Sequence, residues 1–211
     1  MNKRPGLLGY YNYTVYLTYL GMLAGFCGIL QVLQGNCRMA VILLLAAGFC
    51  DMFDGAVAST KKDRTRSERS FGIQIDSLSD LICFGVLPAA IGYSLSGRGL
   101  AALLAASFYV LCALIRLAYF NVDEQERQQR EDTSRKLYYG LPVTSSALVI
   151  PILYGAAKAA AFSPAPAMLT ALAAMACLFL TPFSVQKPGK VIKGCLLAAG
   201  FAVIFFVILS R

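Results

Sequence analysis

Four aspartates in two apolar stretches are the residues of this sequence best suited to chemistry. Asp51 and Asp54 stand near the end of one apolar stretch, and Asp76 and Asp80 stand near the start of the next. Spacings of three and four residues put both members of each pair on one face of a helix. Because a carboxylate inside a membrane-spanning helix costs about 2.5–3.5 kcal/mol, this grouping indicates a function.

The two pairs predict a metal site. The connection between the two stretches is short, so their helices are expected to be antiparallel neighbours whose carboxylates converge near one membrane surface. Anions this close repel one another unless cations lie between them. An all-oxygen ligand set favours Mg²⁺ or Mn²⁺, with Ca²⁺ as a non-productive occupant, and such hard ions serve phosphate chemistry. Gly55 and Gly72 flank the acids and would let a ligand approach the backbone closely.

The composition places these acids in a membrane. Of the 211 residues 58% are hydrophobic and 14% are charged, and the mean hydropathy is +0.64. Several apolar blocks exceed the roughly 18 to 20 residues that cross a bilayer as a helix. We therefore predict one domain, 1–211, that is an all-α transmembrane bundle. The expected spans are 12–34, 39–59, 71–95, 99–121, 141–162, 167–185 and 191–210.

The basic residues predict the orientation of the bundle. The net charge is +8, and most Lys and Arg residues fall in segments that lie on one side of the seven-span arrangement. These are the N-terminus with Lys3 and Arg4, and the segments 61–69, 127–136 and 187–193. The asymmetry places this side, the N-terminus and the four acids in the cytoplasm. It also makes nucleic acid an unsuitable partner, since no basic stripe with interleaved aromatics occurs. The polar segment 123–138 is expected to be a solvated loop or short helix.

Two residue types narrow the chemistry. The sequence has no histidine, which excludes Ser-His, Cys-His and His-metal mechanisms within this chain. A general base must then be a carboxylate, Lys, Tyr or Cys. The seven cysteines form no CxxC pair and lie almost entirely in apolar blocks, so they are predicted to be small buried side chains rather than disulfides or zinc ligands. No cleavage pattern follows the first apolar block, which is expected to remain as a span.

The acid pattern resembles the signature of the CDP-alcohol phosphatidyltransferase family, DxxDGxxAR followed by GxxxDxxxD. The matching positions are Asp51, Asp54, Gly55, Ala58, Gly72, Asp76 and Asp80. Ser59 stands where the family has Arg, and the spacer 60–71 is longer than usual for the family. The missing Arg removes an expected phosphate or nucleotide contact. Lys61, Lys62 or Arg64 from the longer loop is a candidate to replace it.

The resemblance narrows to the membrane-embedded phosphatidylserine synthases. It is carried by FGIQIDSLSDLICFGVLPA (71–89), RLAYFNV (116–122) and YGLPVTSSA (139–147). It implies transfer of the phosphatidyl group of CDP-diacylglycerol to L-serine, giving phosphatidylserine and CMP. It also implies a homodimer with a six-helix core around a polar cavity. The expected location is a bacterial plasma membrane, with the site open to the cytoplasm.

The resemblance also implies roles for residues. Asp51, Asp54 and Asp76 would hold the metal on the pyrophosphate, and Asp80 would be the general base for the serine hydroxyl and a further metal ligand. The expected CDP-lipid contacts are Asp51, Gly55, Ala58, Ser59, Gly72 and Lys62. Arg116, near a span end, is the first candidate for the serine carboxylate, although it could instead snorkel to the interface. Weaker serine candidates are Asn121, Lys136 and Thr144.

Two other functions fit parts of the pattern. Glycerol 3-phosphate or inositol phosphate could be the acceptor, but these acceptors carry a phosphate and would need an extra basic cluster at the cavity. The sequence offers only Arg116 and loop residues there, which mildly favours serine. A cation transporter could use the four aspartates as a relay. Transporters commonly place their ligands near the midplane and are built from repeats. Here the acids lie towards one face and no repeat is evident, so transport is the weaker alternative.

Overall fold

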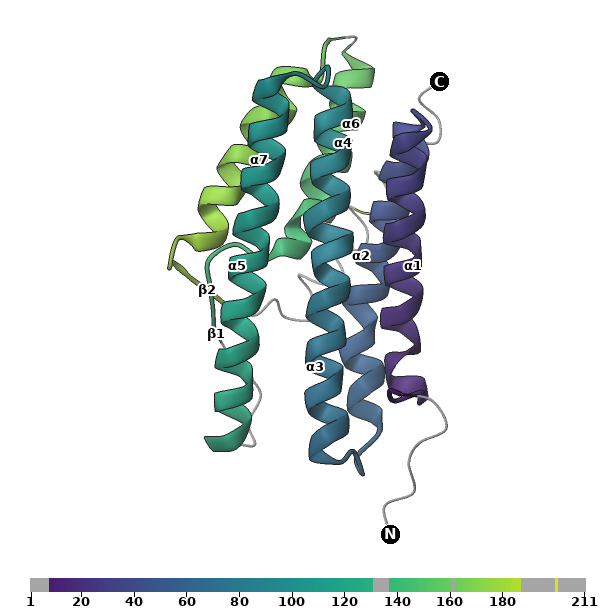
Figure 1. Cartoon of the computed structure of the whole chain (residues 1–211), viewed down its shortest axis with the longest axis vertical. Helices are drawn as coiled ribbons and strands as arrows, with labels where there is room; N and C mark the ends of the chain where they lie inside the picture. Colours follow the sequence, from purple (N-terminus) through teal and green to yellow (C-terminus); the bar gives the residue numbers. More distant parts are fainter. Residues whose placement is uncertain (1–7, 131–136, 161, 187–199, 201–211) are drawn as a thin grey trace.

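The computed structural model describes residues 8–130, 137–160, 162–186 and 200, and these form a bundle of long helices (Figure 1). The helices are α1 Tyr13–Leu33, α2 Cys37–Thr60, α3 Arg66–Asp80, α4 Leu87–Leu95, α5 Leu100–Arg130, α6 Ser146–Ala159 and α7 Ala165–Leu180. A π-helical turn, Leu81–Val86, joins α3 to α4, and a 3₁₀ turn, Val143–Ser145, precedes α6. Two short strands, β1 Leu137–Tyr139 and β2 Ser184–Gln186, pair antiparallel.

The helices have the lengths and surfaces of a membrane protein. Among the described residues, four stretches are long and apolar enough to cross a bilayer, namely Tyr13–Leu33, Cys37–Thr60, Arg66–Leu95 and Leu100–Arg127. Large apolar side chains remain exposed along α1 and α5, including Leu20, Leu23, Phe26, Leu104, Phe108 and Leu111. Lipid, rather than water, is the solvent that such a surface suits. The predicted helical membrane bundle is confirmed. The expected span 191–210 lies outside the described residues.

Two features of the fold differ from the sequence expectation. Helix α5 continues to Arg130, whereas the expected span ends at residue 121. The extra turns are rich in Glu, Gln and Arg, which are good helix formers, and Arg127 pairs with Glu124 one turn earlier. The β1–β2 ribbon was not expected, because strands this short carry no readable alternation.

Glycines bring α1 close to the column formed by α3 and α4. A Cβ placed on Gly25 would lie 2.6 Å from Sγ of Cys83, and one placed on Gly28 would lie 2.7 Å from Cδ2 of Leu87. The Cys83 thiol also donates to the carbonyl of Gly21 at 3.3 Å. Small residues at helix contacts permit this approach in lipid. The acid-bearing helix is therefore held tightly along one side.

One carboxylate fastens three helix ends beside the acids. Glu68 and Thr65 form a capping box at the start of α3. The same carboxylate accepts from Nζ of Lys61 at 2.8 Å and from Nδ2 of Asn12, the N-cap of α1, at 3.0 Å. The hydrogen bond and charge of Glu68 raise the pKa of Lys61, so Lys61 stays protonated to a higher pH than a free lysine side chain would. The turn between α2 and α3 is thereby fixed against α1.

Candidate metal centre and substrate cavity

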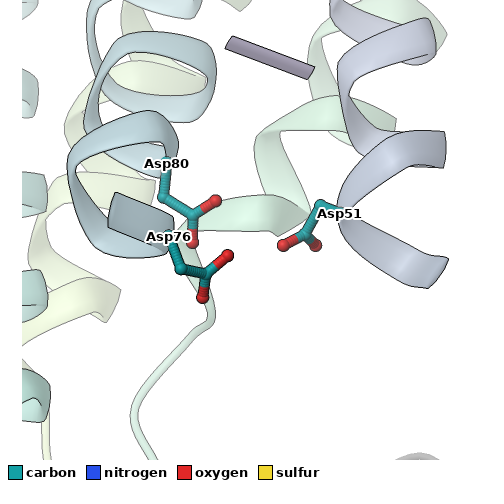
Figure 2. Close-up of side chains that lie close together, drawn as sticks. All are labelled: Asp51, Asp76 and Asp80. Atoms are coloured by element: carbon teal, nitrogen blue, oxygen red, sulfur yellow. The ribbon is translucent and has the colours of Figure 1, made fainter. Parts of the chain in front are cut away.

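Three aspartates from two helices face one another in the bundle. Asp51 lies on α2, and Asp76 and Asp80 lie one turn apart on α3, with their carboxylates pointing towards a common centre (Figure 2). One oxygen from each of the three lies within 4.8 Å of the others. The sequence spacing explains the arrangement, since residues four apart share a helix face.

The fourth predicted ligand lies at the edge of this group. Asp54 lies within hydrogen-bonding reach of Asp76. Its Oδ2 accepts from Oγ1 of Thr18 at 3.1 Å, which ties it to α1. The structure thus brings together all four acids that the spacing selects. Thr18 is a neighbour that the sequence did not single out.

The chemistry of this donor set fits a hard divalent cation. Every candidate ligand atom is a carboxylate oxygen, which Mg²⁺, Mn²⁺ and Ca²⁺ prefer and which softer metals do not. The carboxylates are partly buried, so their mutual repulsion is weakly screened by solvent. A cation held between them would remove that repulsion. The group can therefore bind a metal ion.

A cavity of about 550 Å³ adjoins the acids. Asp54 and Asp76 line it, so the candidate metal centre and the cavity share a wall. The predicted CDP-lipid contacts that also line it are Gly55, Ala58, Ser59, Lys62 and Gly72. A Cβ placed on Gly55 would meet no atom within 4 Å, so this glycine borders open space. The volume is sufficient for a nucleotide-sized group, because ligand pockets commonly measure about 300–1,000 Å³.

The cavity is more basic than the sequence suggested. Its cationic lining residues are Lys61, Lys62, Arg64, Arg69 and Arg127. Arg69 lies three residues before Gly72 and seven before Asp76, so helical phase could have placed it on this face. Arg127 carries no such local signal, because its position depends on how α5 packs across the bundle. Glu124 also lines the cavity and pairs with Arg127.

The side chain of Arg64 lies against Gly72, the glycine that begins the second half of the motif. A Cβ on Gly72 would lie 2.5 Å from Nη2 of Arg64, and this nitrogen donates to the carbonyl of Glu68 at 3.2 Å. The Nε of Arg64 is buried and has no hydrogen-bond partner among the described residues. Ser59, at the usual Arg position, donates its hydroxyl to the carbonyl of Ala56 at 2.7 Å. Gly72 thus makes room for a guanidinium, whereas the sequence reading assigned that room to the nucleotide.

The predicted serine contacts lie elsewhere. Of the described residues, Arg116, Asn121 and Thr144 are not among those that line the cavity, and Lys136 lies outside the described residues. Asn121 accepts from Oγ of Ser77 at 2.5 Å, linking α5 to α3. Thr144 belongs to the 3₁₀ turn before α6. Their roles in binding serine stay predictions.

Arg116 is built into the packing of the bundle. It is 6% exposed, and its Nη1 donates to the carbonyls of Tyr139 at 2.7 Å and Phe179 at 3.1 Å. Its guanidinium also lies 4.5 Å from the ring centre of Phe120. A Cβ on Gly140 would lie 2.8 Å from the same nitrogen. Arg116 on α5 therefore links the end of β1 and the end of α7 to that helix.

Comparison with known proteins identifies a matching family. The model of the CDP-alcohol phosphatidyltransferase family matches residues 11–208. The chain is 35% identical over 162 residues to a CDP-diacylglycerol–serine O-phosphatidyltransferase of Saccharomyces cerevisiae, a match that covers 72% of this chain and 56% of the relative. It is 34% identical over 139 residues to an archaetidylserine synthase of Methanothermobacter thermautotrophicus, covering 65% and 55%. A Bacillus subtilis CDP-diacylglycerol–serine O-phosphatidyltransferase is 29% identical over 132 residues, covering 60% and 68%. The chain spans a little over half the length of the yeast and archaeal relatives.

Proposed function

The chain belongs to the CDP-alcohol phosphatidyltransferase family, and we propose that it transfers the phosphatidyl group of CDP-diacylglycerol to L-serine, giving phosphatidylserine and CMP. The observation that carries this proposal is the convergence of Asp51, Asp76 and Asp80 beside a cavity lined by cations. Carboxylates that can hold a hard metal, next to cationic side chains, suit a pyrophosphate substrate.

In this proposal the CDP group occupies the cavity while the acyl chains remain in the bilayer. Asp54, Gly55, Ala58, Ser59, Lys62 and Gly72, all of which line the cavity, surround the nucleotide and pyrophosphate. Asp51, Asp54, Asp76 and Asp80 would hold Mg²⁺ or Mn²⁺. When bound, the metal supplies neutralisation of the pyrophosphate and of the charge that develops on the departing CMP.

The remaining steps fall to the chain's own residues. The serine hydroxyl oxygen attacks the phosphorus on the lipid side of the pyrophosphate. The new oxygen–phosphorus bond replaces the bond to the bridging oxygen, and CMP leaves with that oxygen. Asp80, one turn deeper than Asp76, takes the hydroxyl proton. Positioned proton removal of this kind contributes about 10²- to 10⁴-fold to a rate.

The proposed acceptor, serine, has to be weighed against acceptors that carry a phosphate. The names of the yeast and Bacillus relatives specify serine, and we transfer that acceptor to this chain. The basic lining of the cavity, however, is what an acceptor with its own phosphate would need. Glycerol 3-phosphate or inositol phosphate is therefore the second candidate. We assign most of the positive charge to the CDP-lipid, which leaves serine as the preferred acceptor.

Release of CMP tests the function and the acceptor together. The full chain in detergent is supplied with CDP-diacylglycerol and either Mn²⁺, Mg²⁺ or a chelator. CMP is then measured with serine, glycerol 3-phosphate, inositol phosphate or no acceptor. We expect release that requires both metal and serine, with phosphatidylserine as product. Release with a phosphate-bearing acceptor instead would replace serine, and metal-independent release would contradict the proposed site.

We propose that Arg64 supplies the phosphate contact that Ser59 cannot make. Arg64→Ala is expected to raise KM for CDP-diacylglycerol about 10- to 100-fold with little change in KM for serine, because hydrogen bonds to charged groups contribute about 1.5–3 kcal/mol. Arg66 is exposed and does not line the cavity, so Arg66→Ala is the matched control and should behave as wild type. Initial rates at varied lipid concentration measure both constants.

A second substitution separates replacement from a general charge effect. Ser59→Arg in the otherwise unchanged chain should improve KM for the lipid only slightly, since Arg64 already provides the contact. In the Arg64→Ala background the same substitution should restore most of the loss. A large improvement from Ser59→Arg in the unchanged chain would instead show that its site lacks this contact.

We further propose that the active protein is a homodimer of single-domain chains in a plasma membrane, with the cavity open to the cytoplasm. Support for the orientation comes from the basic lining residues near the ends of α2 and α3, which follow the positive-inside preference. A cysteine placed at exposed Asp63 should react with a membrane-impermeant maleimide only after cells are opened. Reaction in intact cells would reverse the orientation. Crosslinking in native membranes tests the dimer.

A further inference from the structure

The acid-bearing helix changes its winding immediately after the last aspartate. Asp80 ends α3, and the π-helical turn Leu81–Val86 follows it directly. The N–H of Leu87 donates to the carbonyl of Ile82, five residues earlier. A π turn inserts one extra residue into an α-helix. Because each α-helical residue turns the chain by about 100°, the insertion rotates the face of α3 relative to that of α4 by about the same angle.

The rotation lets α4 pack in the core of the bundle while α3 presents its aspartates to α2. The side chains of Leu87 and Ile91 on α4 are fully buried in the core of the bundle. Asp76 and Asp80 on α3 point instead towards Asp51 on α2. If the winding of the π turn relaxed, α4 would remain held by its packing and the aspartates would turn away from their common centre.

The backbone carbonyl of Phe84 in this turn lacks the donor that a regular α-helix would provide. In an α-helix the carbonyl of Phe84 would accept from the N–H of residue 88, but residue 88 is a proline and has none. Two buried hydroxyls donate to this carbonyl instead. Oη of Tyr109 on α5 lies 2.8 Å away, and Oγ of Ser146 on α6 lies 3.2 Å away. Both residues are fully buried.

We propose that Tyr109 and Ser146 are positioning residues for the metal centre: by satisfying the Phe84 carbonyl they hold the π turn and thereby the rotation of Asp76 and Asp80. The inference rests on the proposed metal site. Two donors converge on one acceptor, so either alone can satisfy it. With both removed, the Phe84 carbonyl loses these two donors, a loss that commonly costs about 1–3 kcal/mol, and the turn is no longer anchored to α5 and α6.

Metal affinity in the absence of substrate tests this role. Tyr109→Phe, Ser146→Ala and the double variant are prepared as full chains in detergent, and the dissociation constant for Mn²⁺ is measured by electron paramagnetic resonance. Each single change should weaken Mn²⁺ binding by at most about threefold. The double change should weaken it by about thirtyfold or more, which exceeds the roughly ninefold loss that two independent threefold changes would give and which a shared acceptor requires. Tyr154→Phe, another buried tyrosine of the same core, should bind Mn²⁺ as wild type does.

A pair of equal-volume variants covers the case in which the double variant does not fold. Threonine and valine differ at one position by a hydroxyl against a methyl. In the Tyr109→Phe background, Ser146→Thr should keep near-normal Mn²⁺ binding, whereas Ser146→Val should lose it. Equal Mn²⁺ affinities in this pair, or additive losses in the first series, would overturn the inference while leaving wild-type Mn²⁺ binding intact. Failure of the wild type to bind Mn²⁺ would contradict the proposed metal site and this inference with it.

Discussion

Asp76→Asn is expected to abolish metal binding and turnover while leaving the protein folded. Asp76 belongs to the group with Asp51 and Asp80, lies within reach of Asp54, and lines the cavity. No other acid in the part of the chain that the structure describes takes part in all three arrangements. Even residues that only orient metal ligands commonly cost 10- to 100-fold in metal affinity or activity when changed, so loss of a central ligand should exceed about 100-fold. Amide replacement also removes one of the repelling charges, which should leave stability without metal unchanged or raised.

Thermal unfolding with and without Mn²⁺ checks this prediction independently of activity. A ligand that binds only the folded state stabilises it by about 2.7 kcal/mol at 100 times its Kd. The wild type should therefore show a higher Tm with Mn²⁺, and Asp76→Asn should show the same Tm with or without it. Asp63 is exposed and does not line the cavity, so Asp63→Asn should retain the wild-type response. A Mn²⁺-dependent rise in Tm that survives in Asp76→Asn would remove this residue from the metal centre.

The fold was predictable where local pattern decides the structure. Apolar length fixed the helices, because a helix that crosses lipid must satisfy its own backbone and cover about 30 Å. The two aspartate pairs were placed on facing helices for a related reason: their spacings select one face, and the short turn between α2 and α3 returns the chain so that carboxylates of the two helices come within reach of one another. Such inferences need no knowledge of the remaining helices.

Other features depend on contacts between distant segments. A charge near a span end predicts a polar partner for Arg116, but spacing does not predict that the carbonyls of Tyr139 and Phe179 would accept from it. Neither the pairing of β1 with β2 nor the place of Arg127 in the cavity follows from spacing. Pro88 is a visible cause of the π turn. The proline alone does not predict that the hydroxyls of Tyr109 and Ser146 donate to the Phe84 carbonyl in place of the missing N–H.

Asp80→Asn is expected to separate catalysis from metal binding. If Asp80 takes the serine proton, the amide variant loses the base and kcat should fall about 10²- to 10⁴-fold. Asp51, Asp54 and Asp76 remain as oxygen ligands, so the Kd for Mn²⁺ should change by less than in Asp76→Asn, and KM for CDP-diacylglycerol should change little. Initial rates together with Mn²⁺ titration measure these constants on the same preparation.

The comparison of the two amide variants decides between the roles open to Asp80. Its carboxylate lies within the same 4.8 Å group as Asp51 and Asp76, so geometry alone permits a ligand or a base. Loss of Mn²⁺ binding in parallel with turnover, to the extent seen in Asp76→Asn, would leave Asp80 as a metal ligand with no separate role as the base. Substantial residual turnover with normal metal binding would move proton removal to another group. Lost turnover with Mn²⁺ binding weakened less than in Asp76→Asn is the expected result, because the base is needed at the step of attack whereas three other carboxylates remain to hold the metal.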